Sequence, residues 1–73
     1  MTRIPVVSGP DAVRALGRLG YVIARQRGSH ASLRADGRPP LTVPMHDELA
    51  PGTLRAILRA ANLTVEEFLR LLD

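Results

Sequence analysis

The spacing of apolar residues changes several times along the chain, and each change marks a new element. Between Ser8 and Gly20, Val13, Leu16 and Gly17 follow the three-to-four-residue spacing of an amphipathic helix. Ser8 is expected to cap the N-terminus of this first helix, and Gly20 is expected to end it. Gly17 lies within the apolar stripe, so we expect it to let the helix approach a sheet closely.

Short segments with β-branched, aromatic or alternating residues follow, and turn signals separate them. Residues 21–27 and residues 30–35 flank Gly28-Ser29, and the Asp36-Gly37 turn lies between the second segment and residues 41–45. Because both connections are short, consecutive strands are expected to pair with each other. The pattern predicts a three-stranded antiparallel meander.

Alternation along the second predicted strand indicates which side chains face the helices. Apolar residues occupy every second position from Ala31 to Ala35, and we expect them to pack against the helices. His30, Ser32 and Arg34 then project from the opposite face of the sheet. The histidine is therefore expected at the surface, on the face or at the rim that the helices do not cover.

The other two predicted strands are less regular. In residues 21–27 apolar residues occupy both alternating sets, so no face can be assigned. In residues 41–45 the alternation places the apolar residues inward and His46 outward. Pro44 cannot donate a ladder hydrogen bond, which predicts that this strand lies at an edge or ends there.

Helical spacing returns in the last part of the chain. Residues 51–62 form an amphipathic segment that Asn62 is expected to end, and Thr64 with Glu67 matches the capping box of a further helix. The apolar face of the earlier helix is expected to contain Leu54, Ile57, Leu58 and Ala61. The apolar face of the later helix is expected to contain Val65, Phe68, Leu69 and Leu72. The predicted class is α+β, with one helix, the meander and then two helices.

Length and composition narrow the kind of protein. A chain of 73 residues, 45% hydrophobic and 23% charged, is typical of one globular domain, so residues 1–73 are expected to form a single unit. The absence of cysteine excludes disulfides and thiolate metal sites. No apolar run approaches the ~20 residues of a membrane span, and no secretory signal is recognisable, so a cytoplasmic location without a membrane partner is expected.

The charge favours a nucleic-acid partner. All ten basic residues are arginine, and the net charge is +3. Arginine matches phosphate bidentately, although a coding preference for arginine would also explain the missing lysine. Such a preference does not explain why basic residues gather around the first hairpin turn. The basic residues there are Arg25, Arg27 and Arg34. With His30, and with Gly28 and Ser29 as backbone donors, they are the candidate site residues.

A histidine among arginines is well placed to meet an anion such as phosphate. Histidine transfers protons near neutral pH, and arginines with backbone donors stabilise phosphate charge. His30 and His46 are isolated from other ligand side chains, so no metal or other cofactor is expected. His46 is either a second catalytic group or a loop histidine bonded to nearby backbone. Arg55 and Arg59 form either a solvated helix face or a contact with RNA or a partner.

Several segments, in this order, resemble the HicA family of toxin–antitoxin toxins. They are spread along nearly the whole chain, and their order is more specific than a GSH tripeptide alone. The matching segments are LGRLGYV, RGSH, TVPMH, PGTLRAIL and ANLTVEEFLRLL. The family's fold is similar to a double-stranded-RNA-binding domain, which implies a three-stranded antiparallel sheet with helices on one face.

The resemblance also implies a function. It implies an mRNA interferase, an endoribonuclease that stops translation, and a HicB-type antitoxin that covers its active site. The family's catalytic histidine is that of the GSH motif, which is His30 here. Members often carry lysine before this motif, whereas Arg25 and Arg27 stand here; they preserve a charge contact but cannot act as a general acid. A non-catalytic RNA-binding module and a purely protein-binding subunit are the alternatives.

Overall fold

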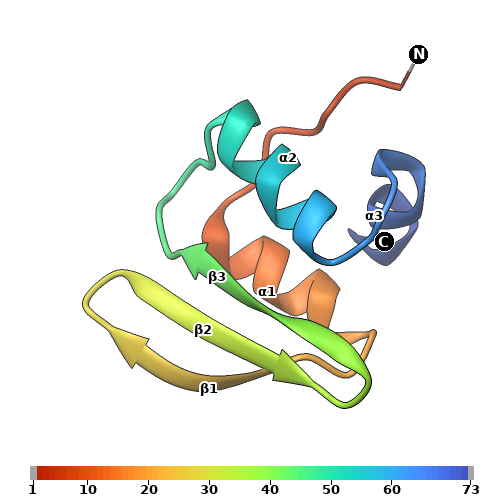
Figure 1. Cartoon of the computed structure of the whole chain (residues 1–73). Coiled ribbons are helices and arrows are strands. Elements are labelled where there is room, and N and C mark those ends of the chain that lie inside the picture. Colours follow the sequence, from red (N-terminus) through yellow and green to blue (C-terminus); the bar gives the residue numbers. More distant parts are fainter. Residues whose placement is uncertain (1, 73) are drawn as a thin grey trace.

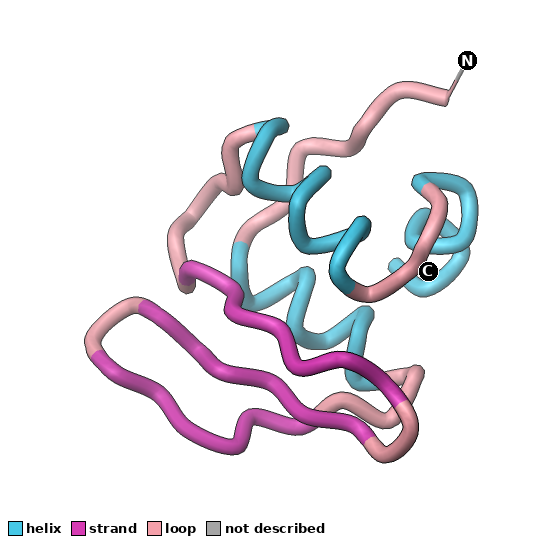
Figure 2. Tube along the Cα trace, viewed as in Figure 1, coloured by secondary structure: helices cyan, strands magenta, loops and turns pink. Residues whose placement is uncertain are grey.

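The computed structural model describes residues 2–72, and its elements follow the predicted order. Three strands form one antiparallel sheet with the order β1-β2-β3. The helices lie on one side of this sheet (Figures 1 and 2). The elements are α1 (Gly9–Gly17), β1 (Val22–Arg27), β2 (His30–Ala35), β3 (Arg38–Pro44), α2 (Pro51–Ala60) and α3 (Val65–Leu72). This arrangement confirms the predicted α+β, double-stranded-RNA-binding-domain-like fold.

Helix α1 starts as predicted but presents a different face to the core. The Ser8 hydroxyl accepts a hydrogen bond of 3.0 Å from the Asp11 backbone N–H, as expected of an N-cap. The predicted inward position of Gly17 is wrong, because this residue is exposed and a Cβ built on it would have no neighbour within 4 Å. The buried residues are instead Gly9, Ala12, Ala15 and Leu16.

The close approach between α1 and the sheet occurs at Gly9. A Cβ atom at this position would lie 2.1 Å from the carbonyl oxygen of Pro44 and 2.7 Å from the Cα of Met45. The Gly9 N–H also donates a hydrogen bond of 2.8 Å to the carbonyl of His46. The first residue of α1 is therefore in direct backbone contact with the end of β3.

The alternation predicted for β2 is confirmed. Ala31 and Leu33 are completely buried against the helices, whereas His30 and Arg34 are exposed. In β3, Leu41 and Val43 are buried in the same way, so these two strands form the floor of the core. The core cluster contains Val7, Ala12, Ala15, Leu16, Tyr21, Ala31, Leu33, Leu41, Val43, Leu49, Leu54, Ile57, Leu58, Ala61 and Phe68.

Strand β1 contains a β-bulge that the alternation did not reveal. Ile23 pairs with Leu33 and Arg25 pairs with Ser32, so Ala24 is an extra residue between consecutive pairs. An extra residue moves every following side chain to the other face of the strand. This explains why neither alternating set of residues 21–27 could be assigned to the core. Every residue of β1 is exposed.

Strand β3 is longer at its start than the sequence predicts. It begins at Arg38 rather than at residue 41, and Pro39 and Pro40 belong to it. An edge strand tolerates proline because only one side of its backbone pairs with a neighbour. The Tyr21 hydroxyl donates a hydrogen bond of 2.8 Å to the Pro39 carbonyl and so joins this segment to the start of β1. The strand ends at Pro44 and lies at the sheet edge, as predicted.

The C-terminal helices follow the predicted caps. The residues predicted for the apolar face of α2 are all buried. Asn62 has a φ of 59°, a left-handed conformation that ends a helix. The Thr64 N–H donates to Glu67 at 2.8 Å, and the Glu67 N–H donates to the Thr64 hydroxyl at 3.1 Å. Hydrogen bonding from Thr64 to the Glu67 carboxyl, from the backbone N–H first and from the side chain second, lowers the pKa of that carboxyl.

Candidate nucleic-acid interface

The helix-free face of the sheet brings together the predicted site residues. Arg27 lies directly opposite His30 across β1 and β2, and Arg25 lies opposite Ser32. Opposed residues of antiparallel strands point to the same face, with Cβ atoms about 4.5–5.5 Å apart. The imidazole therefore stands beside one arginine, with a second arginine one pair further along the same face. We call this surface, formed by Arg25, Arg27, His30, Ser32 and Arg34, the open face.

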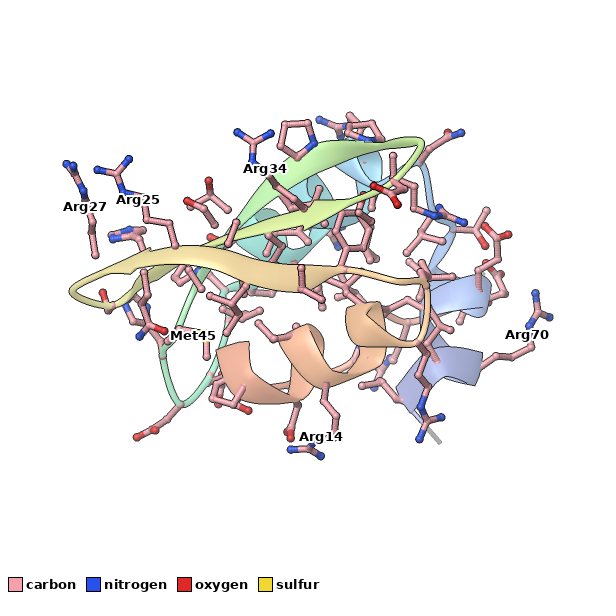
Figure 3. The ribbon with its side chains drawn as sticks, turned by 90° about the horizontal axis from the view of Figure 1, so that it is seen from below. Arg14, Arg25, Arg27, Arg34, Met45 and Arg70 are labelled. Atoms are coloured by element: carbon pink, nitrogen blue, oxygen red, sulfur yellow. The ribbon has the colours of Figure 1, made fainter. Side chains whose placement is uncertain are left out.

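The open face is separated from the helices by the sheet itself. Figure 3 shows Arg25, Arg27 and Arg34 pointing to the side of the sheet away from α1, while Arg14 lies on the far side of α1. Met45, by contrast, points to the helix side. The two-residue turn produces this gathering, because regular pairing outward from Gly28-Ser29 places Arg27 opposite His30 and Arg25 opposite Ser32.

The arginines of the open face have no acidic partner. Among residues 2–72 no ion pair involves Arg25, Arg27 or Arg34, whereas Arg14 is paired with Asp11 at 3.0 Å on α1. Each unpaired guanidinium keeps its fork of N–H donors in water. Such a group can bind phosphate bidentately without first breaking an internal salt bridge.

The Gly28-Ser29 turn holds His30 at the end of its strand. Gly28 has a φ of 55°, which favours glycine in a two-residue hairpin turn. The Ser29 carbonyl accepts a hydrogen bond from the Met45 backbone N–H, so the turn is attached to the segment that follows β3. This attachment limits the movement of the turn that carries Gly28 and Ser29, the residues directly before His30.

His46 lies near the same end of the sheet. Pro44 pairs with His30 across β2 and β3, and His46 follows Pro44 by two residues. Its carbonyl accepts the hydrogen bond from Gly9, whereas its side chain is exposed. The bond involves only the backbone of His46, so the exposed imidazole remains a candidate for a second proton-transfer group.

Other predicted candidates lie away from the open face. Arg55 and Arg59 are exposed on α2 and line a hollow of about 430 Å³ near the link between α2 and α3, on the helix side of the molecule. Tyr21 and Phe68 are buried, so neither ring is available for stacking on a base.

Within residues 2–72 no group of three or more histidine, cysteine or acidic side chains could hold a metal ion. None of the described helices has the length and apolar composition needed to cross a membrane.

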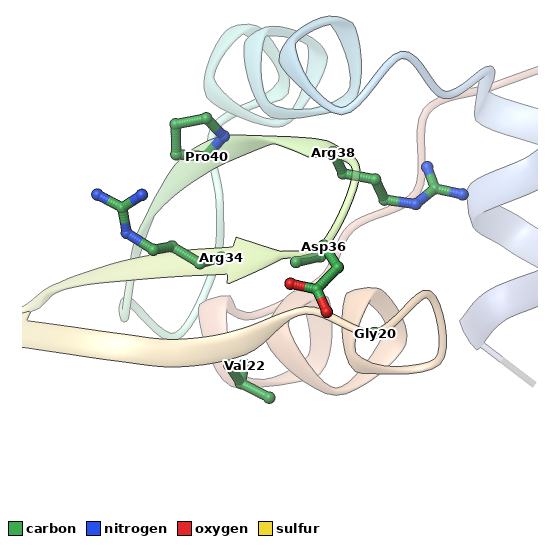
Figure 4. A pocket seen from close by; sticks show the side chains of 7 residues that line it. Gly20, Val22, Arg34, Asp36, Arg38 and Pro40 are labelled. Carbon is green, nitrogen blue, oxygen red and sulfur yellow. The ribbon is translucent and has the colours of Figure 1, made fainter.

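Sequence reasoning missed a groove at the far end of the open face. Arg34 borders it together with residues from the ends of the strands and the turn between them (Figure 4). The groove has a volume of about 440 Å³. Its lining residues are Gly20, Val22, Arg34, Ala35, Asp36, Arg38 and Pro40. The pairing of Val22 with Arg34 depends on the bulge, so alternation alone could not have brought these residues together.

Comparison with known proteins identifies the family. A chain of a solved toxin–antitoxin complex from Streptococcus pneumoniae is 31% identical to this one, with a TM-score of 0.68; the match covers 78% of this chain and 98% of that chain. No curated protein sequence matches. The family model of the HicA toxin of bacterial toxin–antitoxin systems matches residues 9–63, which include the whole sheet and the His30 hairpin. The chain therefore belongs to the HicA toxin family.

Proposed function

We propose that this toxin is an endoribonuclease that cleaves mRNA without a metal ion and thereby inhibits translation as part of a type II toxin–antitoxin system. Family membership supports a toxin. The observation that supports the chemistry is the placement of Arg27 directly opposite His30 on a face that no helix covers. A proton-transfer group and a phosphate-binding group thus stand side by side where an extended RNA strand can reach both.

The chemistry needs only groups that the open face provides. His30 removes the proton from a 2′-OH, the 2′-oxygen forms a bond to the adjacent phosphorus, and the bond from phosphorus to the 5′-oxygen breaks. Arg25 and Arg27 stabilise the charge that develops on the phosphate oxygens. A protonated imidazole then supplies the proton that the leaving 5′-oxygen requires. His30 fills both roles in turn, or His46 fills the second.

The proposed partner is a HicB-type antitoxin. The related chain from Streptococcus pneumoniae was solved in a toxin–antitoxin complex, and Arg25, Arg27, His30 and Arg34 of the open face are exposed here. An antitoxin that covers His30, Arg25 and Arg27 blocks substrate sterically. Unpaired arginines also favour an acidic surface on the partner, because complementary charge speeds association and orients the encounter.

The test of the function is incubation of the purified protein with single-stranded RNA, with and without a chelator. We expect cleavage under both conditions and a product that ends in a 2′,3′-cyclic phosphate. Replacing the 2′-OH at the cleavage site with hydrogen should block cleavage there, because the nucleophile is absent. If the protein binds RNA but leaves it intact, the chain is a non-catalytic RNA-binding module and the proposed reaction is wrong.

The role of Arg27 is tested by the salt dependence of RNA affinity. On single strands, each phosphate contact contributes a slope of about −0.7 to the plot of log affinity against log salt concentration. We expect Arg27→Ala to make this slope shallower by about that amount. The control is Arg14→Ala, which removes the same charge from α1 and should leave the slope unchanged. Wild-type affinity that does not depend on salt would contradict electrostatic binding at the open face.

A further inference from the structure

The groove at the far end of the open face shares Arg34 with that face. His30, Ser32 and Arg34 alternate along the same face of β2, so Arg34 stands about 13 Å from His30. The intervening Ser32 has Arg25 opposite it. An RNA strand that lies along β2 with one phosphate at His30 therefore passes Arg25 and reaches the groove with a nearby nucleotide.

The size and lining of the groove suit one nucleotide. Its volume of about 440 Å³ lies within the usual range for small-ligand sites, ~300–1,000 Å³. Val22 and Pro40 give it apolar walls that can contact a base or ribose, and Val22 is 63% exposed. Arg34 and Arg38 reach outward on opposite sides of Asp36 (Figure 4). Arg34 can meet the phosphate next to a bound base, whereas Arg38 extends toward α3, where it also lines a hollow with Glu67 and Arg70.

Asp36 is the side chain that can distinguish one base from another. Its carboxylate is exposed in the hairpin turn and lies between the two arginines in Figure 4. It makes no ion pair or side-chain hydrogen bond with residues 2–72. A carboxylate offers two acceptor oxygens and no donor. On the Watson–Crick edge, guanine alone presents two adjacent donors, N1–H and the N2 amino group, whereas the other bases present a donor beside an acceptor.

We infer that this groove is a base-recognition subsite that prefers guanine close to the scissile phosphate, with Asp36 accepting both donors and Arg34 binding the neighbouring phosphate. The inference rests on the proposed RNA-binding function and adds a sequence preference to it. The preference is modest, because water competes for an exposed carboxylate. Roughly fivefold discrimination is expected, the low end for a bidentate base contact.

The experiment measures binding, so it does not depend on cleavage. His30→Ala protein is titrated against short oligouridylates that carry one guanine, adenine or cytosine at each position in turn. One position is expected to favour guanine about fivefold over the others. The variant Asp36→Asn, made in the same protein, presents one donor and one acceptor in place of two acceptors, so the preference for guanine at that position should be lost. Glu66→Gln removes the same charge from α3, outside the groove, and should leave the preference for guanine unchanged.

The outcomes separate the inference from the function on which it rests. Binding without any base preference, or a guanine preference that Asp36→Asn leaves intact, overturns the subsite while RNA binding stands. A failure to bind any of the oligonucleotides overturns both. A guanine preference that is lost in Asp36→Asn but kept in Glu66→Gln assigns the recognition to the Asp36 side chain, because both variants remove one negative charge and only one of them changes the groove.

Discussion

His30→Ala is expected to abolish RNA cleavage and toxicity while the protein stays folded. His30 is exposed at the start of β2 and contributes nothing to the core. Surface substitutions usually change the free energy of unfolding by less than about 0.5 kcal/mol, so the melting temperature should be nearly unchanged. Removal of a general acid–base group lowers the rate by about 10²–10⁴-fold. The cleavage rate of one RNA by wild type and variant, with a melting curve for each, measures both effects.

Two further measurements make the assignment of His30 specific. Affinity for uncleavable 2′-deoxy RNA should be largely retained by His30→Ala, because Arg25 and Arg27 remain to bind phosphate. His46→Ala removes the other histidine; a large loss of rate there as well would identify the second proton-transfer group. A folded His30→Ala protein that cuts at the wild-type rate would show that His30 is not catalytic and that the proton is moved elsewhere.

Among the glycines of residues 2–72, Gly9 is expected to lose the most stability when it is replaced by alanine. The new Cβ would lie 2.1 Å from the Pro44 carbonyl oxygen; this oxygen is a backbone atom and the Cβ is bonded directly to the Cα, so no side-chain rotation relieves the contact. Overpacking of this kind costs about 1–3 kcal/mol. In a domain of this size, each kcal/mol lowers the melting temperature by roughly 4–8 °C. Thermal unfolding followed by circular dichroism measures the effect.

The matched control is Gly17→Ala on the same helix. Nothing lies within 4 Å of a Cβ there, and alanine is favoured over glycine in a helix by up to about 1 kcal/mol. This variant should melt at or slightly above the wild-type temperature. Equal melting temperatures for the two variants would contradict the close contact between α1 and the end of β3. Because Pro44 is paired with His30, Gly9→Ala should also lower activity, whereas Gly17→Ala should not.

Where the sequence pattern is strict, it predicts the structure well. The alternation in β2 assigned the buried and exposed residues correctly, and with them the exposed position of His30. The Thr64–Glu67 capping box and the Asn62 stop were likewise predicted from local chemistry, because both depend only on residues within one helical turn. Such features are determined by short segments, and a single sequence contains all the information they need.

Features that depend on contacts between distant segments were not predictable in this way. Gly17 and Gly9 fit helical spacing equally well, and only the position of β3 decides which of them must lack a side chain. Arg38 and the prolines after it looked like a turn, yet pairing with β2 makes them a strand. The groove at the end of the open face required the same information, since its residues come from separate strands and the turn between two of them.

The bulge at Ala24 has a consequence for how the toxin tolerates mutation. A substitution at Ala24 replaces one exposed side chain with another and leaves the pairing of Arg25 with Ser32 in place. Deletion of Ala24 leaves Ile23–Leu33 and Arg25–Ser32 as consecutive pairs of a regular ladder, so Arg25 and Arg27 keep the face of His30. Deletion of Gln26 does something different: it makes the two arginines neighbours, and because successive side chains of a strand point to opposite faces, the arginines no longer share that face. The site is therefore encoded partly as a residue count. In β1 the loss of the codon between the two arginines should be as harmful as the loss of one of the arginines themselves.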